Sequence, residues 1–477
     1  MSETPKTTAL ILGAGKTGLG VAQVLKERNY QVSLLERNAD AAASAQVEGW
    51  DVTHCETDEQ MGKLACDAHA DLVVASPGIS VFSEALAPVI AQQEVISEVE
   101  LAWRLQQADG GEQPWLCVTG TNGKTTTVEM AATILRAAGQ RAYAVGNNGQ
   151  SLISRVHSGD YDALVVELSS FQLALTYTVE PTASLCLNVA ADHLDWHRSF
   201  EHYRDSKARV YENTKIACVF PQGDEVVRKM VEDADVQEGA RAIGITLGHP
   251  GPSDFGLVEQ YLVDRAFVEN RYQQAAEVAD LEELATAWSA APSPAVVLDA
   301  LAAAALTRAV GVEPVAVRDG LMRFATPGHR RHVLGQVAEV TWIDDSKATN
   351  AHAARASLAG IEPGRAVWIV GGLTKGQDLS ELVAEVASRL RAAIIIGEDR
   401  TALREAFQTH APQLPVVEVD GHEDFLMSVV HEAVALSRPG DTILLAPACA
   451  SWDQFKSYSE RGDLFADAVR RLAEQQA

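Results

Sequence analysis

The sequence lacks paired cysteines, long apolar runs and an excess of basic residues. Its six cysteines are dispersed, form no C-x-x-C pair and lie mostly in apolar stretches, as expected of buried thiols in a reducing compartment. No apolar run reaches the roughly 18 residues that span a bilayer, and the run Ala9–Leu12 is too short for the core of a secretion signal. We therefore expect a cytoplasmic protein that does not insert into membranes.

Basic residues are scarce relative to acidic ones. The chain has 39 Lys and Arg against 65 Asp and Glu, a net charge of -26, so its surface repels nucleic-acid phosphates and anionic membranes. Nucleic-acid binding is therefore disfavoured. A small anionic substrate remains compatible with this charge, provided that a few well-placed cations line its pocket. The length of 477 residues predicts roughly three domains at about 100 to 200 residues each.

Strand-like apolar runs alternate with helical segments, which predicts an α/β fold. A first βαβ unit comprises a strand at Thr8–Leu12, a glycine turn at Gly13–Gly18, a helix at Leu19–Arg28 and a strand at Gln31–Leu35. Further strands are expected in the same domain at Asp71–Ala75 and Glu94–Ile96.

The rest of the chain repeats this alternation, apart from an irregular stretch at residues 235–294 for which no structure is predicted. In the middle we expect strands at Trp115–Val118, Ala163–Glu167 and Ala183–Leu187 and helices at Thr125–Ala138 and Ala295–Val310. Later strands are expected at Glu339–Ile343, Ala366–Val370, Ala393–Ile396, Val416–Val419 and Thr442–Leu445. The predicted domains are Rossmann-like (1–102), P-loop ATPase-like (103–325) and Rossmann-like (326–477).

The first glycine loop, G-A-G-K-T-G at Gly13–Gly18, fits the dinucleotide-binding fingerprint, with Glu36 at the end of the following strand. The loop requires only that a diphosphate lie against backbone N–H groups at a helix start. This requirement suits NAD and a UDP-sugar equally. A tight turn without a ligand is the remaining alternative.

The second glycine loop, G-T-N-G-K-T-T at Gly120–Thr126, is a stronger signal because it follows a strand and opens a helix. Gly123 lets the backbone approach phosphate, Lys124 neutralises the β and γ oxygens, and the Thr125 hydroxyl suits magnesium. The loop departs from the ordinary P-loop because Val118 stands five residues before Gly123.

Glu167 and His193 follow apolar strands near this loop, where they are reasonable ligands for a hard metal held mainly by phosphates. For a lone Glu or His, a hydrogen-bonded loop residue would be the better interpretation, but the neighbouring P-loop favours a ligand. Lys207 lies near the start of a predicted helical segment, and its pattern alone is typical of a solvated helix lysine.

Four polar segments of the last domain follow strands or the domain junction, the positions at which open α/β sheets bind ligands. Any one of them is compatible with a capped loop, but four in one domain favour a binding site. These segments are His329–Arg331, Asp344–Asn350, Gly371–Lys375 and Ala446–Phe455.

Together these motifs resemble the Mur ligases, ATP-dependent amide-forming enzymes of peptidoglycan synthesis. S-P-G at Ser76–Gly78, E-L-S-S-F-Q, D-S-K-A-T-N and A-C-A-S-W-D-Q-F are similar to the members that add D-glutamate, and the D-N-P-R signature of the diaminopimelate- or lysine-adding members is absent. The resemblance implies that ATP phosphorylates the carboxylate of UDP-N-acetylmuramoyl-L-alanine and that D-glutamate then attacks the acyl phosphate. It also implies a role in cell-wall growth, cell shape and division.

The resemblance assigns residues to each part of this reaction. Members of the family carry a carbamylated lysine at the position of Lys207, because a carbamate binds a cation that an ammonium would repel. The implied catalytic residues are Lys124, Glu167, His193, Lys207, Arg330 and Lys347, and the implied magnesium ligands are Thr125, Glu167, His193 and Lys207. ATP would be bound by Gly120, Thr121, Asn122, Gly123, Lys124, Thr125, Thr126, Arg330 and Asp345. The UDP-sugar would contact Thr17, Glu36, Arg37, Ser76, Gly78 and Asn147, and D-glutamate would contact Lys347, Thr349, Lys375, Ser451 and Tyr458.

The sequence departs from the family pattern at several positions. Ala295 and Val296 replace an H-N pair near the expected adenine site, Leu373 replaces a frequent acid, and Tyr458 replaces a Phe. The nearest alternatives are another Mur ligase or a folate-type ligase with a different acceptor. More distant ones are an NAD-dependent oxidoreductase built on the Gly13 loop and a non-enzymatic, nucleotide-gated binding protein. We expect a monomer.

Overall fold

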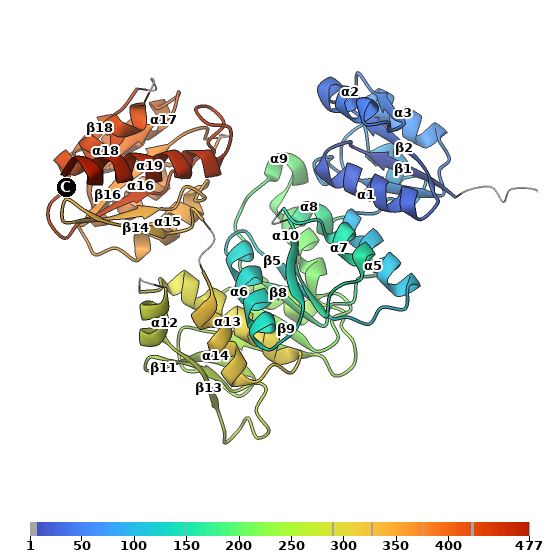
Figure 1. Ribbon diagram of the computed structural model, residues 1–477, viewed down its shortest axis with the longest axis horizontal. Helices are drawn as coiled ribbons and strands as arrows, with labels where there is room; N and C mark the ends of the chain where they lie inside the picture. The colour runs from blue at the N-terminus through green and yellow to red at the C-terminus, as the bar shows by residue number, and fades with distance from the viewer. Residues whose placement is uncertain are drawn as a thin grey trace, which may run out of the picture. The chain divides into compact units, whose positions relative to one another are not determined.

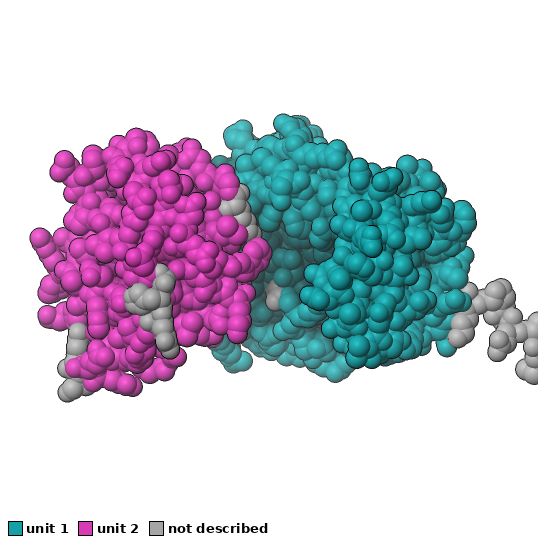
Figure 2. Space-filling model, turned by 90° about the horizontal axis from the view of Figure 1, so that it is seen from above, with its two compact units in different colours: residues 1–281, 298–324 teal, residues 282–297, 325–477 magenta. Residues whose placement is uncertain are grey.

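The computed structural model describes residues 7–147, 149–288, 291–325, 328–374, 376–420 and 424–476. The chain divides into two compact units, one of residues 1–281 and 298–324 and one of residues 282–297 and 325–477 (Figure 2). The described residues form three sheets, each flanked by helices (Figure 1), which confirms the predicted α/β class.

The first sheet has four parallel strands in the order β3-β2-β1-β4. The predicted strand at Glu94–Ile96 is wrong, because Ile96 forms only one isolated bridge, to Val74. The first helix begins at Lys16, three residues before its predicted start. The elements are β1 (Thr8–Leu12), α1 (Lys16–Glu27), β2 (Gln31–Glu36), α2 (Ala39–Val47), β3 (Val52–His54), α3 (Asp58–Asp67), β4 (Leu72–Ala75), α4 (Ala87–Ile90) and α5 (Glu98–Ala108).

The second sheet has nine strands in the order β13-β12-β11-β10-β9-β8-β5-β7-β6. The strands from β5 to β10 pair in parallel, so their carboxyl ends share one edge. They and the helices among them are β5 (Trp115–Thr119), α6 (Lys124–Ala137), β6 (Ala142–Gly146), α7 (Leu152–Ser158), β7 (Ala163–Glu167), α8 (Ser170–Leu173), β8 (Ala183–Cys186), α9 (Leu194–His197), α10 (Phe200–Ala208), a 3-10 turn η1 (Arg209–Tyr211), β9 (Ala217–Pro221), α11 (Glu225–Asp233) and β10 (Arg241–Ile245).

The stretch that the sequence left without a prediction extends this sheet. There β11 pairs in parallel with β10, and β12 and β13 continue antiparallel. Helix α14 then packs on α6 so closely that a Cβ on Gly320 would lie 2.4 Å from the Ile134 Cα atom. The elements are β11 (Asp254–Val258), β12 (Tyr261–Asp264), β13 (Ala276–Asp280), α12 (Leu281–Ala287), α13 (Pro294–Ala309) and α14 (Pro314–Arg323).

The third sheet has six strands in the order β14-β15-β19-β16-β17-β18, parallel except for the β14–β15 pair. All five strands predicted for this domain are present, and β14 was not predicted. The elements are β14 (His332–Val337), β15 (Val340–Asp344), α15 (Ala351–Ala359), β16 (Ala366–Gly371), α16 (Ser380–Val386), η2 (Ala387–Arg389), β17 (Leu390–Ile396), α17 (Thr401–His410), β18 (Val416–Glu418), α18 (Phe425–Leu436), β19 (Thr442–Leu445) and α19 (Tyr458–Gln476).

Burial follows the sequence pattern. All six cysteines are free thiols, and only Cys66 is partly exposed, as predicted for core residues. Trp115, Trp342 and Trp368 are fully buried on central strands of the sheets. Within the described residues, no helix combines the length and the apolarity needed to cross a membrane.

Candidate active site

The second glycine loop joins the end of β5 to the start of α6. Gly120 and Gly123 have φ angles of 149° and 86°, and a Cβ on Gly123 would lie 2.5 Å from an Asp299 carboxylate oxygen, so glycine is required there. The Lys124 ammonium folds back over the loop and donates to the carbonyls of Gly120 (2.7 Å) and Thr121 (3.0 Å). The loop thus presents a helix N-terminus and a cation on one side, the arrangement that binds phosphate.

Glu167, at the end of β7, lies beside this loop because β5 and β7 are parallel neighbours. Its carboxylate is 2% exposed and accepts hydrogen bonds from the Thr125 hydroxyl (2.7 Å) and the Asn147 amide (3.2 Å). The structure therefore brings together two of the predicted metal ligands, Thr125 and Glu167. It also places Asn147, a predicted sugar contact, at the same carboxylate.

His193 caps the start of α9 with a left-handed backbone (φ 52°) and is half exposed. Its Nε2 atom lies 3.6 Å from the Asp192 carboxylate, and its ring contacts Phe171 edge-on. Partial burial lowers its pKa, which favours the neutral imidazole. Across the described part of the chain, no group of three or more His, Cys, Asp and Glu side chains is arranged to hold a metal ion by itself.

Lys207 contradicts two predictions made from its sequence pattern. It lies in the last turn of α10 rather than near the start of a helix, and it is 2% exposed rather than solvated. Its ammonium donates to the Gly120 carbonyl (3.0 Å) and lies 3.3 Å from the Thr119 hydroxyl. Burial, followed by the nearby Lys124 charge, lowers the pKa of Lys207 to about 7. The interpretation of Lys207 as a solvated lysine was wrong because the face of α10 that carries Tyr203 and Lys207 packs against the Gly120–Thr126 loop.

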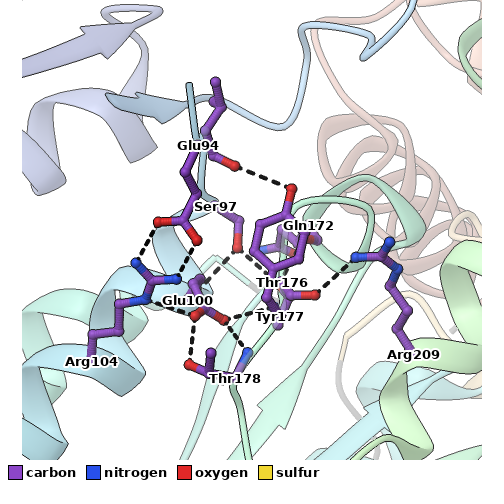
Figure 3. Close-up of polar contacts among 10 residues, drawn as sticks. Glu94, Ser97, Glu100, Arg104, Gln172, Thr176, Tyr177, Thr178 and Arg209 are labelled. Atoms are coloured by element: carbon purple, nitrogen blue, oxygen red, sulfur yellow. Dashed lines mark hydrogen bonds and ion pairs between the residues drawn. The ribbon is translucent and has the colours of Figure 1, made fainter. Parts of the chain in front are cut away.

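The segment that follows α8 is held in place by an acid of α5. Glu100, fully buried on α5, accepts from the backbone N–H groups of Tyr177 (2.8 Å) and Thr178 (2.9 Å) and from the Thr178 hydroxyl (2.6 Å) (Figure 3). Arg104 donates to Glu100 and to Glu94, which raises the pKa of the guanidinium. This network fixes the chain that follows α8 against α5.

The first glycine loop, Gly13–Gly18, is hydrogen-bonded to Glu36 at the end of β2. The Glu36 carboxylate, predicted to bind a ribose, accepts from the Ala14 backbone N–H within the loop and from the Asn38 N–H. The Ser76 hydroxyl points to the Gly13 carbonyl at 3.4 Å, and Arg37 pairs with Asp58. The predicted sugar contacts lie at or just beyond the carboxyl ends of β1, β2 and β4: Thr17, Glu36, Arg37, Ser76 and Gly78.

Sequence patterns missed the link between this loop region and the His193 segment. The Trp196 indole donates to the Pro77 carbonyl (3.1 Å), and the Ser80 hydroxyl donates to the Trp196 carbonyl (2.7 Å). The Tyr203 hydroxyl, also missed, lies 2.9 Å from the Thr121 hydroxyl of the P-loop. An aromatic residue beside a polar motif is too common a pattern to have indicated either contact.

In the second unit, two predicted segments, 329–331 and 344–350, meet at the carboxyl end of β15. His329 Nδ1 lies 2.6 Å from the buried Asp344 carboxylate, and the Lys347 backbone N–H donates to the His329 carbonyl (3.0 Å). Asp345 accepts from the Arg331 backbone N–H (3.2 Å) and from the Ser357 hydroxyl, and burial raises its pKa. Arg330 lies between His329 and Arg331 in the loop that precedes β14.

Of the predicted amino-acid contacts, Lys347 and Thr349 lie in the loop after β15, Ser451 follows β19 and Tyr458 begins α19. The Lys347 ammonium is 3.9 Å from the centre of the Tyr458 ring, and Ser451 is 2% exposed after β19. Thr349 follows Lys347 in the turn before α15, and Lys375 lies outside the described residues. Leu373, which replaces a frequent acid, is 44% exposed and bridges to Ala450.

Three domain families match successive parts of the chain. They are described as "Mur ligase MurD-like, N-terminal domain" over residues 7–97, "Mur ligase middle domain" over residues 118–253 and "Mur ligase, glutamate ligase domain" over residues 329–449.

Full-length relatives carry one common name. The chain is 47% identical over 469 residues to the UDP-N-acetylmuramoylalanine--D-glutamate ligase of Streptomyces coelicolor, with 97% of each chain covered. It is 44% identical over 474 residues to the enzyme of that name from Thermobifida fusca, covering 97% of this chain and 98% of the relative.

Solved structures share the fold at lower identity. A pseudomurein peptide ligase type C from Methanothermus fervidus has a TM-score of 0.56 at 17% identity and covers 99% of this chain and 100% of its own. The MurF ligase from Thermotoga maritima in complex with ADP has a TM-score of 0.56 at 16% identity, covering 100% and 97%.

Proposed function

The chain belongs to the Mur ligase family, and we propose that it joins D-glutamate to UDP-N-acetylmuramoyl-L-alanine with hydrolysis of ATP to ADP and phosphate, a step of peptidoglycan synthesis. The observation that carries this proposal is the full-length likeness to relatives named for that reaction. The predicted cytoplasmic location and monomeric state are part of the same proposal.

The reaction has two steps. In the first, a carboxylate oxygen of the terminal alanine attacks the γ-phosphorus of ATP, the bond to the bridging oxygen breaks, and ADP leaves. In the second, the amine of D-glutamate attacks the acyl carbon, the bond to the phosphate oxygen breaks, phosphate leaves, and the amine loses a proton. Both the carboxylate and the γ-phosphate are anionic, so cations must offset their repulsion.

Lys124 is the first such cation. Its ammonium now caps carbonyls of Gly120 and Thr121, and bound phosphates would replace those acceptors with stronger, charged ones. We assign ATP binding to the loop Gly120–Thr126 with Arg330 and Asp345. Arg330, together with Lys347, would neutralise charge on the transferring phosphoryl group.

Magnesium fits the oxygen donors at the P-loop. The Thr125 hydroxyl and the Glu167 carboxylate are hard ligands 2.7 Å apart, and they would share a first ion. His193 and Lys207 would hold a second. Bound magnesium supplies positive charge that stabilises the phosphates and the developing acyl phosphate. Since the side chains supply few ligands, phosphate oxygens would complete both coordination shells.

Lys207 suits this role only as a carbamate. Its buried amine with a pKa of about 7 is substantially neutral at physiological pH, so its nitrogen can attack the carbon of CO2 and release one proton. The product carries an anionic oxygen pair where an ammonium would repel a dication. The remaining roles follow the family pattern. We assign the UDP-sugar to Thr17, Glu36, Arg37, Ser76, Gly78 and Asn147, and D-glutamate to Lys347, Thr349, Lys375, Ser451 and Tyr458.

Phosphate release tests the proposal. The purified protein is incubated with ATP, magnesium and UDP-N-acetylmuramoyl-L-alanine, and D-glutamate, L-glutamate, L-alanine and diaminopimelate are supplied in parallel. Release with D-glutamate alone supports the proposal, whereas release with another amino acid identifies a different acceptor. NAD binding without ATP turnover would favour the oxidoreductase alternative.

Two variants separate the subsites. Lys124→Ala should abolish release while the melting transition remains, because this lysine contributes charge and little packing. Ser451→Ala should raise the KM for D-glutamate far more than the KM for ATP, because a dicarboxylate needs hydroxyl donors. Equal increases in both constants would contradict a separate acceptor site.

A further inference from the structure

The first turn of α19 contacts two of the segments that we assign to substrates in the second unit. The Tyr458 carbonyl accepts from the Ser346 hydroxyl (2.7 Å), and its ring lies under the Lys347 ammonium. Gly462 packs against the imidazole of His329, where a Cβ would lie 2.0 Å from the Nδ1 atom. One helical turn therefore touches both the 329–331 and the 344–350 segments.

Arg461, between those two positions, is fully buried and joins two loops. Its Nε atom donates to the Ser346 hydroxyl (2.9 Å), and Nη2 donates to the Ser346 carbonyl (2.8 Å). Both Nη atoms also lie 3.3 Å from the Cys449 carbonyl. Ser346 directly precedes Lys347, and Cys449 lies two residues before Ser451. The guanidinium thus spans the loop after β15 and the loop after β19.

This guanidinium has no carboxylate partner in an ion pair among the residues that the structure describes. Burial lowers the pKa of Arg461 to about 10, so the side chain still carries its charge at neutral pH. The carboxylates of Asp453 and Asp344 attract the guanidinium without forming an ion pair with it. A buried cation whose hydrogen bonds go to one hydroxyl and two carbonyls is costly for folding. This cost suggests a role beyond folding, and the guanidinium lies beneath two loops that we assign to a dicarboxylate.

We propose that Arg461 is a positioning residue that fixes the spacing between the Lys347 loop and the Ser451 loop, and thereby the site for the two carboxylates of the incoming amino acid. This inference rests on the proposed function. Arginine is needed because its planar group donates in several directions at once, whereas a lysine ammonium at the same depth reaches one loop fully and the other poorly.

Kinetic constants for each substrate test the inference. In Arg461→Met we expect the KM for D-glutamate to rise at least tenfold, while the KM for UDP-N-acetylmuramoyl-L-alanine, which we assign to residues of the first unit, changes less than twofold. Arg461→Lys should show a smaller rise in the same constant. In Arg461→Ala, added guanidinium chloride at low millimolar concentration should lower the KM for D-glutamate again, and equal sodium chloride should not.

The control is Arg391→Met. Arg391 pairs with the buried Asp441 near the opposite end of the strands, so its loss should lower the Tm without changing any KM. If Arg461→Met also lowers the Tm and leaves the D-glutamate KM unchanged, Arg461 is only structural and the inference is overturned. If Arg461→Met does not fold, Arg461→Lys decides, and an unchanged D-glutamate KM there overturns it. A parent protein that does not use D-glutamate contradicts the proposed function instead.

Discussion

Lys207 in the first unit and Arg461 in the second are two buried basic side chains with similar surroundings but different pKa values. Each is almost completely inaccessible, and each donates to main-chain carbonyls of a loop at the carboxyl edge of a mainly parallel sheet. Burial lowers both pKa values, to about 7 for Lys207 and about 10 for Arg461.

The difference between the two pKa values shows how the same cost, loss of hydration on burial, has different consequences for a lysine and an arginine. Desolvation disfavours the charged form of either group, but the ammonium begins from a much lower pKa than the guanidinium. At neutral pH Lys207 is therefore close to its neutral, nucleophilic form, which suits modification by CO2. Arg461 keeps its charge and its directional donors, which suits the fixing of two loops. Exchanging the two residue types should therefore be harmful at Lys207 and milder at Arg461.

The largest expected effect is at Lys207. Lys207→Ala and Lys207→Arg should both lower kcat by about a thousandfold or more, because neither side chain can form the carbamate that we propose as a ligand of the second magnesium. Acetate or formate should restore part of the activity of the Ala variant, since a small carboxylate fits the vacated space. Arg is the matched control for charge. Phosphate release with and without added carboxylate measures these effects.

The Lys207→Arg variant tests whether Lys207 differs from Arg461 in the way that we propose. Activity of Lys207→Arg within about tenfold of the parent would show that positive charge, rather than a carbamate, is what this position supplies. An unmodified Lys207 ammonium in a crystal of the magnesium and ATP complex would have the same meaning.

Strand and loop positions could be predicted from the sequence where the local pattern decides them. Thr8–Leu12 and Thr442–Leu445 are apolar after their first residue, and the structure has these strands at the predicted residues. The region 235–294 could not be predicted, because its strands are short and the pairing changes within it from parallel (β10 with β11) to antiparallel (β11 with β12 and β12 with β13). Glu94–Ile96 has strand-like composition, but its chain turns into α5 after one bridge.

The candidate site was predictable where a motif fixes its own geometry. The Gly120–Thr126 loop dictates a turn into a helix, so the positions of Lys124 and Thr125 followed from the sequence. The burial of Lys207 and the contacts of Arg461 could not be predicted. Lys207 contacts Gly120 and Arg461 contacts Ser346, each more than eighty residues away in the sequence. A helical pattern does not show what each face of the helix packs against. Arg461 lies in the polar helix start S-Y-S-E-R-G-D, which is typical of a solvated turn.

The next effect concerns stability and pH. In the folded, metal-free and CO2-free protein the pKa of Lys207 is about 7, whereas its ordinary value is 10.5. Between these values the unfolded chain binds more protons, so the parent gains stability as pH rises, by about 1.4 kcal/mol per pH unit. Lys207→Met removes this dependence. Its stability relative to the parent should therefore be greatest near pH 6.5 and decline steadily toward pH 9.

Arg461→Met provides the contrast in the same measurement. Arginine is protonated in both states below pH 9, because even its lowered pKa is about 10. The difference in stability between this variant and the parent should therefore stay constant from pH 6.5 to 9. Denaturant unfolding at several pH values measures both differences. A flat profile for Lys207→Met would show that Lys207 is better solvated than its burial indicates.

The smallest expected effect is at a lysine whose sequence pattern resembles that of Lys207. Lys229 lies in the middle of α11, and its side chain is 65% exposed and pairs with Asp233 one turn later (2.6 Å). An exposed pair of this kind adds little, because water screens it and the side chains lose freedom. Lys229→Ala should therefore change the Tm by less than about 1 °C and kcat by less than about twofold. Thermal unfolding and phosphate release, measured beside Lys207→Ala, give the comparison directly. A loss of activity at Lys229 comparable to that at Lys207 would mean that depth beside the P-loop is not what distinguishes the two lysines.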